Sequence, residues 1–185
     1  MGESVRERGQ GDKQMITIRS EEPADVEVIH SIHQSSFPTE AEARLVDRLR
    51  DERKLALSLV AEVKVCAVGH VAFSPVSVDP QSPAKRGLGL GPVAVLPEWQ
   101  RKGIGEQLIT RGIEDCRRDG YSFIVVLGEP EYYGRFGFRR ASMFGLANEY
   151  GVDDPFLVLE LSLEGLSKVP GTVKYVKVFS EFTDG

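Results

Sequence analysis

The chain has 185 residues and a formal net charge of −5, and 41% of its residues are hydrophobic and 28% charged. This length fits one globular domain with a sizeable core, and the acidic balance argues against a nucleic-acid partner, because nucleic-acid-binding domains are usually basic. No apolar stretch has the length of a membrane span and the N-terminus has no signal-peptide core, so we expect a cytoplasmic protein with no membrane partner.

The N-terminal residues are polar, charged and without apolar periodicity. We expect a disordered tail over residues 1–13 and a single domain over residues 14–185. Met15 to Arg19 alternates as a strand does, and two amphipathic helices follow. The first runs from Val26 to Phe37 and the second begins near Thr39.

Two pairs of ionisable residues in these helices each allow two interpretations. His30 and His33 have a spacing that metal sites use, but no third ligand is evident, so we expect packing or surface histidines and no metal. Glu40 and Glu42 fit a solvated helix start, with substrate recognition as the alternative.

The middle of the chain predicts a hairpin. Two β-rich runs, Leu57–Val63 and Val65–Val78, flank Lys64. Cys66 and Cys116 lie in apolar patterns without metal-ligand spacing, which predicts two reduced core thiols.

The next apolar run, Leu90 to Leu96, predicts a buried strand preceded by the glycine-rich segment Gly87–Gly91. Gln100–Gly105 then forms a basic, glycine-bearing turn before an amphipathic helix that extends to Cys116. Free backbone N–H groups and the helix dipole make such a helix start suitable for a phosphate or pyrophosphate. Taken alone, however, the glycine pair favours plain strand-to-helix packing. Neither the dinucleotide fingerprint nor a Walker loop is present.

The rest of the chain predicts more strands, with a Pro/Ser/Gly-containing loop at residues 79–87 before the central one. Further strands are expected at Tyr121–Leu127, Phe156–Leu161 and Val173–Phe179. Alternating strands and helices followed by late strands imply an α/β or α+β domain in three layers with a mixed sheet.

Two motifs resemble the GNAT superfamily of N-acetyltransferases. Gln100–Gly105 fits the Gln/Arg-x-x-Gly-x-Gly/Ala signature, and Val125–Phe138 resembles the segment from the family's fifth strand to its Tyr-x-x-x-Gly-Phe element. The residues of the second motif and of the segment from Gly69 to Pro75 are similar to those of the YhbS-type bacterial subgroup. The resemblance implies a central mixed sheet flanked by helices, with splayed fourth and fifth strands.

The resemblance also implies an activity: transfer of an acetyl group from acetyl-CoA to a primary amine by direct attack in a ternary complex. The acceptor is expected to be a small molecule or a protein amine, and the enzyme a monomer or homodimer. Positions matching the family's cofactor site are Val93, Ala94, Val95, Gln100, Arg101, Lys102, Gly103, Ile104 and Gly105. Either Val93 or Ala94 would donate its N–H to the thioester oxygen, since Pro92 has none.

For acid–base chemistry, the resemblance places Tyr133, not Tyr132, as the general acid that protonates the leaving thiolate. Packing under a short helix is the alternative for both tyrosines. No carboxylate occupies the early part of the fourth strand, where several family members have their base. The candidates are Glu129, placed first, then Glu131, Glu62, His70 or a water chain. A non-catalytic acyl-CoA-binding module is the competing function.

Overall fold

The computed structural model describes residues 15–80, 86–163, 165–166 and 170–182. Over these residues one sheet has the order β1-β2-β3-β4-β5-β8-β6, and β9 joins it at β3 and carries β7. The strands are β1 (Ile16–Ser20), β2 (Leu57–Val63), β3 (Cys66–Asp79), β4 (Gly87–Val95), β5 (Phe123–Leu127), β6 (Arg139–Arg140), β7 (Leu146–Asn148), β8 (Phe156–Glu160) and β9 (Gly171–Tyr175). The helices are α1 (Val26–Ser36), α2 (Ala41–Asp51), α3 (Ile104–Arg118) and α4 (Pro130–Gly134), with 3-10 turns η1 (Pro23–Asp25), η2 (Pro97–Trp99), η3 (Ala141–Phe144) and η4 (Lys177–Glu181).

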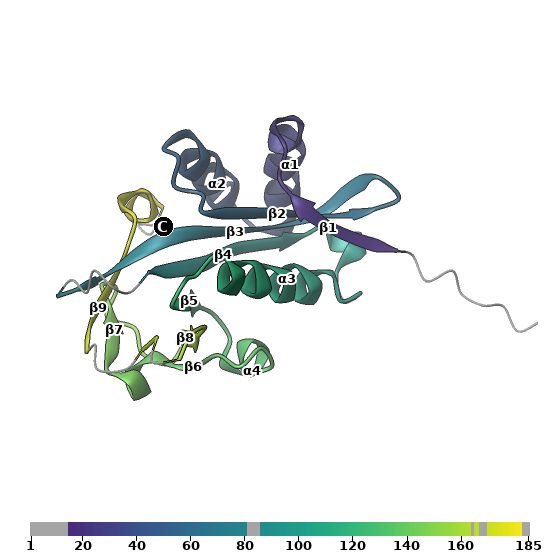
Figure 1. The fold of residues 1–185 in the computed structure, drawn as a ribbon. Helices are drawn as coiled ribbons and strands as arrows, with labels where there is room; N and C mark the ends of the chain where they lie inside the picture. Colours follow the sequence, from purple (N-terminus) through teal and green to yellow (C-terminus); the bar gives the residue numbers. More distant parts are fainter. Residues whose placement is uncertain (1–14, 81–85, 164, 167–169, 183–185) are drawn as a thin grey trace, which may run out of the picture.

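The helices form two layers around the sheet, as the sequence predicts. α1 and α2 lie together on one face and α3 lies on the other (Figure 1). Ile29 of α1 and Val46 of α2 pack with Val60 and Ala72 of the sheet. Neighbouring strand residues point the opposite way, so Phe73 packs with the apolar side of α3. Burial on both faces explains why the central strands lack a polar alternation.

The predicted hairpin is present, and its turn shows why one thiol leaves the core. β2 pairs antiparallel with β3, and the turn residues Lys64 and Val65 have φ values of 50° and 62°. Cys66 follows directly and is exposed, whereas Cys116 on α3 is buried. The expectation of two core thiols is therefore wrong for Cys66, because the turn places it at the solvent end of the sheet.

β4 begins three residues earlier than expected, at Gly87 rather than Leu90. The glycines that suggested a connecting segment are strand residues with large neighbours. A Cβ at Gly87 would lie 2.2 Å from the Phe123 ring, and one at Gly89 would lie 2.8 Å from the Tyr175 ring. Glycine is needed there because aromatic rings from other elements cover the strand.

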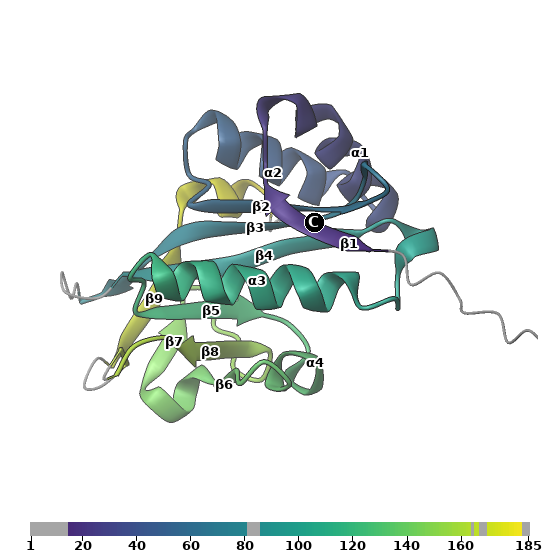
Figure 2. The ribbon, with the colours of Figure 1, turned by 45° about the vertical axis from the view of Figure 1, so that its right-hand side comes forward.

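The fourth and fifth strands splay apart, as the family resemblance implies. β4 pairs in parallel with β5 only at Gly87–Gly89, against Phe123–Val125. Immediately beyond, the register between β3 and β4 shifts between Val71 and Phe73. An irregularity of this kind bends a strand, so β4 leaves β5 and exposes one edge. α4 follows β5 on the far side of this opening (Figure 2).

The C-terminal strand is shorter than predicted. β9 ends at Tyr175, and the remaining apolar residues form η4 instead of extending the strand to Phe179. Val178 and Phe179 of η4 pack on Leu45 and Leu49 of α2. The tail predicted at residues 1–13 and the loop positions 81–85 lie outside the described residues. None of the described helices is long and apolar enough to cross a membrane.

Candidate acyl-CoA and active site

The turn before α3 has the geometry of an anion site. Gly103, the residue before the helix, has a φ of 79°, and Arg101 also has a positive φ of 57°. In the part of the chain that the structure describes, no atom beyond the adjoining residues lies within 4 Å of a Cβ built on Gly103, so this face of the turn is open. Among the described residues no side chain caps the helix start, which leaves its first N–H groups and the positive end of the dipole for a ligand.

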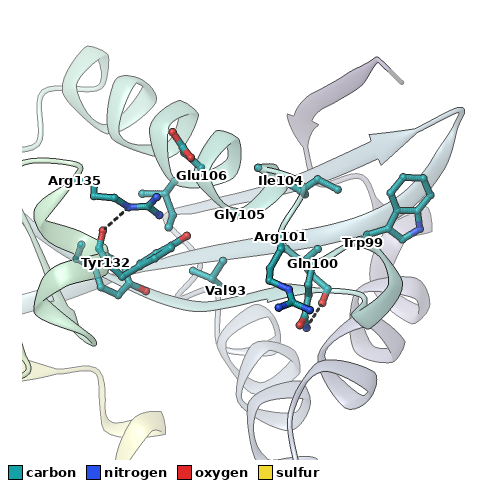
Figure 3. A pocket seen from close by; sticks show the side chains of 13 residues that line it. Val93, Trp99, Gln100, Arg101, Ile104, Gly105, Glu106, Tyr132 and Arg135 are labelled. Atoms are coloured by element: carbon teal, nitrogen blue, oxygen red, sulfur yellow. Dashed lines mark hydrogen bonds between the residues drawn. The ribbon is translucent and has the colours of Figure 1, made fainter. Parts of the chain in front are cut away.

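A pocket of about 540 Å³ lies between this turn, the free part of β4 and α4. Figure 3 shows Val93 in its floor, with Gln100 and Arg101 on one side and Tyr132 and Arg135 on the other. Of the predicted cofactor residues, seven line it: Val93, Val95, Gln100, Arg101, Gly103, Ile104 and Gly105. Tyr133, the predicted acid, lines it too. Segments 30 residues apart in the chain thus meet at one opening.

Two predicted cofactor residues, Ala94 and Lys102, are not among the residues that line this pocket. Ala94 pairs with His70 in the sheet and is buried, so its side chain lies on the face covered by α1. The Lys102 ammonium lies 4.5 Å from the centre of the Trp99 ring, a cation–π contact. Their roles stay predictions.

The strand register distinguishes the two candidate oxyanion donors. The N–H of Leu96 donates to the carbonyl of Val68, and the register continues from Val95 opposite Gly69 to Ala94 opposite His70. In an antiparallel pair, inward and outward N–H groups alternate. Ala94 therefore directs its N–H toward β3, and Val93 directs its N–H toward the open edge. This alternation favours Val93 as the donor.

Tyr133 is held by aromatic neighbours and by a glycine. Its ring makes edge contacts with Tyr132 and Phe138, at centroid distances of 5.0 and 5.8 Å. A Cβ at Gly128 would lie 2.2 Å from the same ring. Burial, and secondarily Tyr132, raises the pKa of Tyr133 to about 12. The phenol is therefore protonated at neutral pH and can act as a proton donor.

Several lining residues were not predicted from the sequence: Trp99, Glu106, Ile109, Tyr132 and Arg135. Arg135 donates from Nε to the Tyr132 carbonyl at 3.3 Å, and its guanidinium lies 4.6 Å from the centre of the Tyr132 ring. This arginine stands inside the second motif, between Gly134 and Phe136, so the motif was the signal that could have found it. It adds a second positive charge to the opening.

The four candidate bases lie in different places. Glu129 and Glu131 line a separate pocket beside Asp154 and are not among the residues that line the pocket with Tyr133. Glu62 of β2 binds Arg19, with Oε1 2.6 Å from Nη2. His70 is fully buried, and burial lowers its pKa. No cluster of three or more His, Cys, Asp or Glu side chains able to hold a metal occurs within the described residues.

Comparison with known proteins agrees with this geometry. Residues 26–138 match the model of the acetyltransferase (GNAT) family. The chain is 36% identical over 167 residues to the uncharacterised N-acetyltransferase YhbS of Escherichia coli K12, covering 89% of this chain and 99% of the relative. It is 35% identical over 125 residues to the uncharacterised N-acetyltransferase YjhQ of the same organism, covering 66% of this chain and 69% of that one.

Solved structures show the same relationship. The crystal structure of Escherichia coli YhbS in complex with CoA superposes with a TM-score of 0.86 at 34% identity, covering 91% of this chain and 94% of that one. A GNAT acetyltransferase from Brucella melitensis in complex with acetyl-CoA gives a TM-score of 0.74 at 34% identity, with 90% and 99% covered. Fold, motifs and sequence identity lead to one conclusion: this chain belongs to the GNAT family of acetyltransferases.

Proposed function

We propose that this protein transfers the acetyl group of acetyl-CoA to a primary amine by direct attack within a ternary complex. One observation carries the proposal: the open edge of β4 lies in a single pocket with the α3 phosphate turn and Tyr133. The two relatives solved with CoA or acetyl-CoA support the choice of cofactor. A small-molecule or protein acceptor, a monomer or homodimer, and a cytoplasmic location remain predictions from the sequence.

The pocket residues have distinct roles in this proposal. The turn at Gly103–Gly105 and the Arg101 side chain bind the pyrophosphate. The pantetheine arm lies along the free edge of β4 as an added strand does, at Val93 and Val95. As the amine attacks, negative charge develops on the thioester oxygen, and the Val93 N–H stabilises it. Tyr133 then protonates the thiolate as it leaves.

Thermal unfolding tests cofactor binding. A ligand at about 100 times its Kd stabilises the folded state by about 2.7 kcal/mol. We expect acetyl-CoA to raise the Tm by several degrees and ATP to leave it unchanged. A protein shown free of co-purified CoA that gives no rise with acetyl-CoA would refute the proposal.

Replacement of the acid tests catalysis. Tyr133→Phe should lower kcat by about 10²- to 10⁴-fold, because a positioned general acid contributes this much. The acetyl-CoA shift in Tm should stay the same. Tyr132→Phe is the matched control, since Tyr132 lines the same pocket, and it should retain most of the turnover.

The measurement is thiol release from acetyl-CoA with a panel of primary amines: n-butylamine, 1,4-diaminobutane and alanine amide. Full activity in Tyr133→Phe would show that the acid is another group. Binding of acetyl-CoA without turnover on a wide range of amines would favour a non-catalytic acyl-CoA-binding module. The assignment of Glu129 as base remains a prediction, which Glu129→Gln tests in the same assay.

A further inference from the structure

The first strand of the chain forms one margin of the sheet and has an open outer edge. Within the described part of the chain, β1 pairs only with β2. The Glu21 N–H donates to the Ser58 carbonyl at 3.0 Å, so the odd-numbered residues of this antiparallel pair direct their backbone groups toward β2. Ile16 and Ile18 therefore direct their N–H and carbonyl groups outward, where another strand can bind them.

β1 lacks the features that usually protect such an edge. Natural sheets protect their edges with proline, lysine, inward-pointing charges or bulges. The sequence of β1 is Ile-Thr-Ile-Arg-Ser, and its pairing with β2 continues without a register shift. Its one charged side chain, Arg19, is bound to Asp25 and Glu62 at 2.6 Å each. The edge is therefore open to a further strand.

A groove of about 540 Å³ lies between β1 and α3. Figure 2 shows the two elements beside each other at this margin of the sheet. The groove is lined by Ile18 of β1 and by Gly103, Glu106, Gln107, Thr110, Arg111 and Glu114 at and along α3. From Gly103 to Glu114 the helix rises by about 16 Å. Five residues of an extended strand span about 17 Å, so the groove has the length of β1 itself.

A strand added to β1 would use the edge and the groove together. In an antiparallel pair, the residue opposite Ile18 exchanges two hydrogen bonds with it, and the two side chains lie on the same face of the sheet. That face is the one with the groove, because Ile18 lines it. Backbone groups of the added strand thus bind the edge, and every second side chain enters the groove.

The charge of the groove indicates its occupant. Glu106 and Glu114 are exposed, and neither has an ion-pair partner among the described residues. Arg111 does not compensate them, because its Nε lies 3.0 Å from both carboxylate oxygens of Asp115, a side chain that is only 4% exposed. A second copy of the chain, placed by a two-fold axis, would bring two more carboxylates to the same groove. The charge therefore favours a cationic segment over a second copy.

The spacing of the two carboxylates indicates where the cations lie. Glu106 and Glu114 are about 12 Å apart along the helix axis, with Thr110 midway between them. In a strand, side chains four residues apart lie on one face and are about 13 Å apart. The matching segment has basic residues at positions i and i+4 and a small apolar residue at i+2.

We propose that the β1 edge and the groove on α3 form a docking site for an extended, positively charged segment of another protein. The segment adds to β1 as a strand and places two lysine or arginine side chains at Glu106 and Glu114. This docking site meets the cofactor pocket only at Gly103 and Glu106, and it does not depend on the acetyl-transfer function.

The test uses the full 185-residue chain and the peptide Ser-Lys-Thr-Val-Thr-Lys-Ser with acetylated and amidated ends. Amide hydrogen exchange is followed by NMR as the peptide is added. The Ile16 and Ile18 amides should exchange about tenfold more slowly or less at saturation, because they become hydrogen-bonded. The Thr17 amide should not change, since it faces β2 in both states.

Two altered peptides separate the backbone contribution from the charge contribution. N-methylation of the central valine removes the N–H that would bind the Ile18 carbonyl, and glutamate in place of both lysines reverses the charge. Each altered peptide should give little protection of Ile16 and Ile18. Equal protection by either one would contradict the corresponding part of the proposal.

Two protein variants test the groove itself. Glu114→Gln should weaken binding of the lysine peptide by about threefold, the effect of one partly exposed ion pair. Glu27→Gln is the control, because it removes the same charge from an exposed position on α1, on the other face of the sheet. The shift in Tm with acetyl-CoA should be the same in both variants.

Three results would overturn the proposal. The first is no protection of Ile16 and Ile18 by the lysine peptide up to its solubility limit, and the second is equal binding by Glu114→Gln and Glu27→Gln. The third is protection of both amides that rises with protein concentration in the absence of peptide, which would assign the edge to a second copy of the chain.

Discussion

At the opening of the pocket, the positions of single side chains are determined by contacts with other elements. Tyr133 keeps its position because Gly128, at the end of β5, leaves room for the ring. Any side chain there would occupy the space of the phenol. A glycine outside the catalytic groups thus determines where the proposed acid lies.

Gly128→Ala should displace the Tyr133 ring, since the new Cβ would lie 2.2 Å from it. We expect a loss of turnover and a decrease in the free energy of unfolding of about 1–3 kcal/mol, as overpacking usually costs. Gly134→Ala is the control, because no atom of the described residues beyond its chain neighbours lies within 4 Å of that Cβ. Equal turnover in the two variants would show that the ring position is not important.

Among the elements, α3 connects the core to the proposed cofactor site. Its buried residues pack on the sheet, while its N-terminus opens toward the pocket. The positive φ at Arg101 and Gly103 turns the chain sharply enough to expose the first amides. The same turn can therefore both pack α3 against the sheet and bind a phosphate.

Arg101→Ala should weaken acetyl-CoA binding by about tenfold, the loss of one charged hydrogen bond to phosphate. Lys102→Ala should have a smaller effect, because Lys102 lies over Trp99 and does not line the pocket. Calorimetric titration with acetyl-CoA measures both. A larger loss in Lys102→Ala would mean that Lys102 turns toward the phosphates when cofactor binds.

At the scale of the whole molecule, a buried polar network joins the α1–α2 hairpin to the sheet. Glu21 accepts a hydrogen bond from Arg50 Nε at 2.5 Å, and through Ser58 and His70 the chain continues to His33. The segment after β1, both helices of the hairpin, and strands β2 and β3 contribute to it. A helix pair held this firmly keeps one side of the opening in place.

The network makes stability depend on pH. Burial, and secondarily the neighbouring His70, lowers the pKa of His33 to about 3, against about 6.5 for an unfolded histidine. Below pH of about 6.5 the unfolded chain binds a proton that the folded chain excludes, so stability falls as pH decreases toward 3. We expect the Tm to fall between pH 7.5 and 5.5, and to fall less in His33→Leu. An identical decrease in both proteins would contradict this origin.

The sequence by itself determined the family, the layer architecture and most of the residues that line the proposed cofactor pocket. Local patterns suffice for these features, because a helix face, a strand and the Gln100–Gly105 turn are each encoded within a few neighbouring residues. The same patterns predicted α3, β5 and the hairpin closely. They failed at β4 and β9, where aromatic rings and η4 from distant segments determine the ends of the strands.

Only the tertiary structure decided the features that join distant segments. The pairing of β4 with β3 directs the Val93 N–H to the open edge, and folding brings Arg135 to the same pocket as Arg101. Glu42 and His33 read as ordinary helix residues in the sequence. Among the described residues, one carboxylate oxygen of Glu42 and Nδ1 of His33 are buried without a hydrogen-bond partner, and no local spacing encodes that condition.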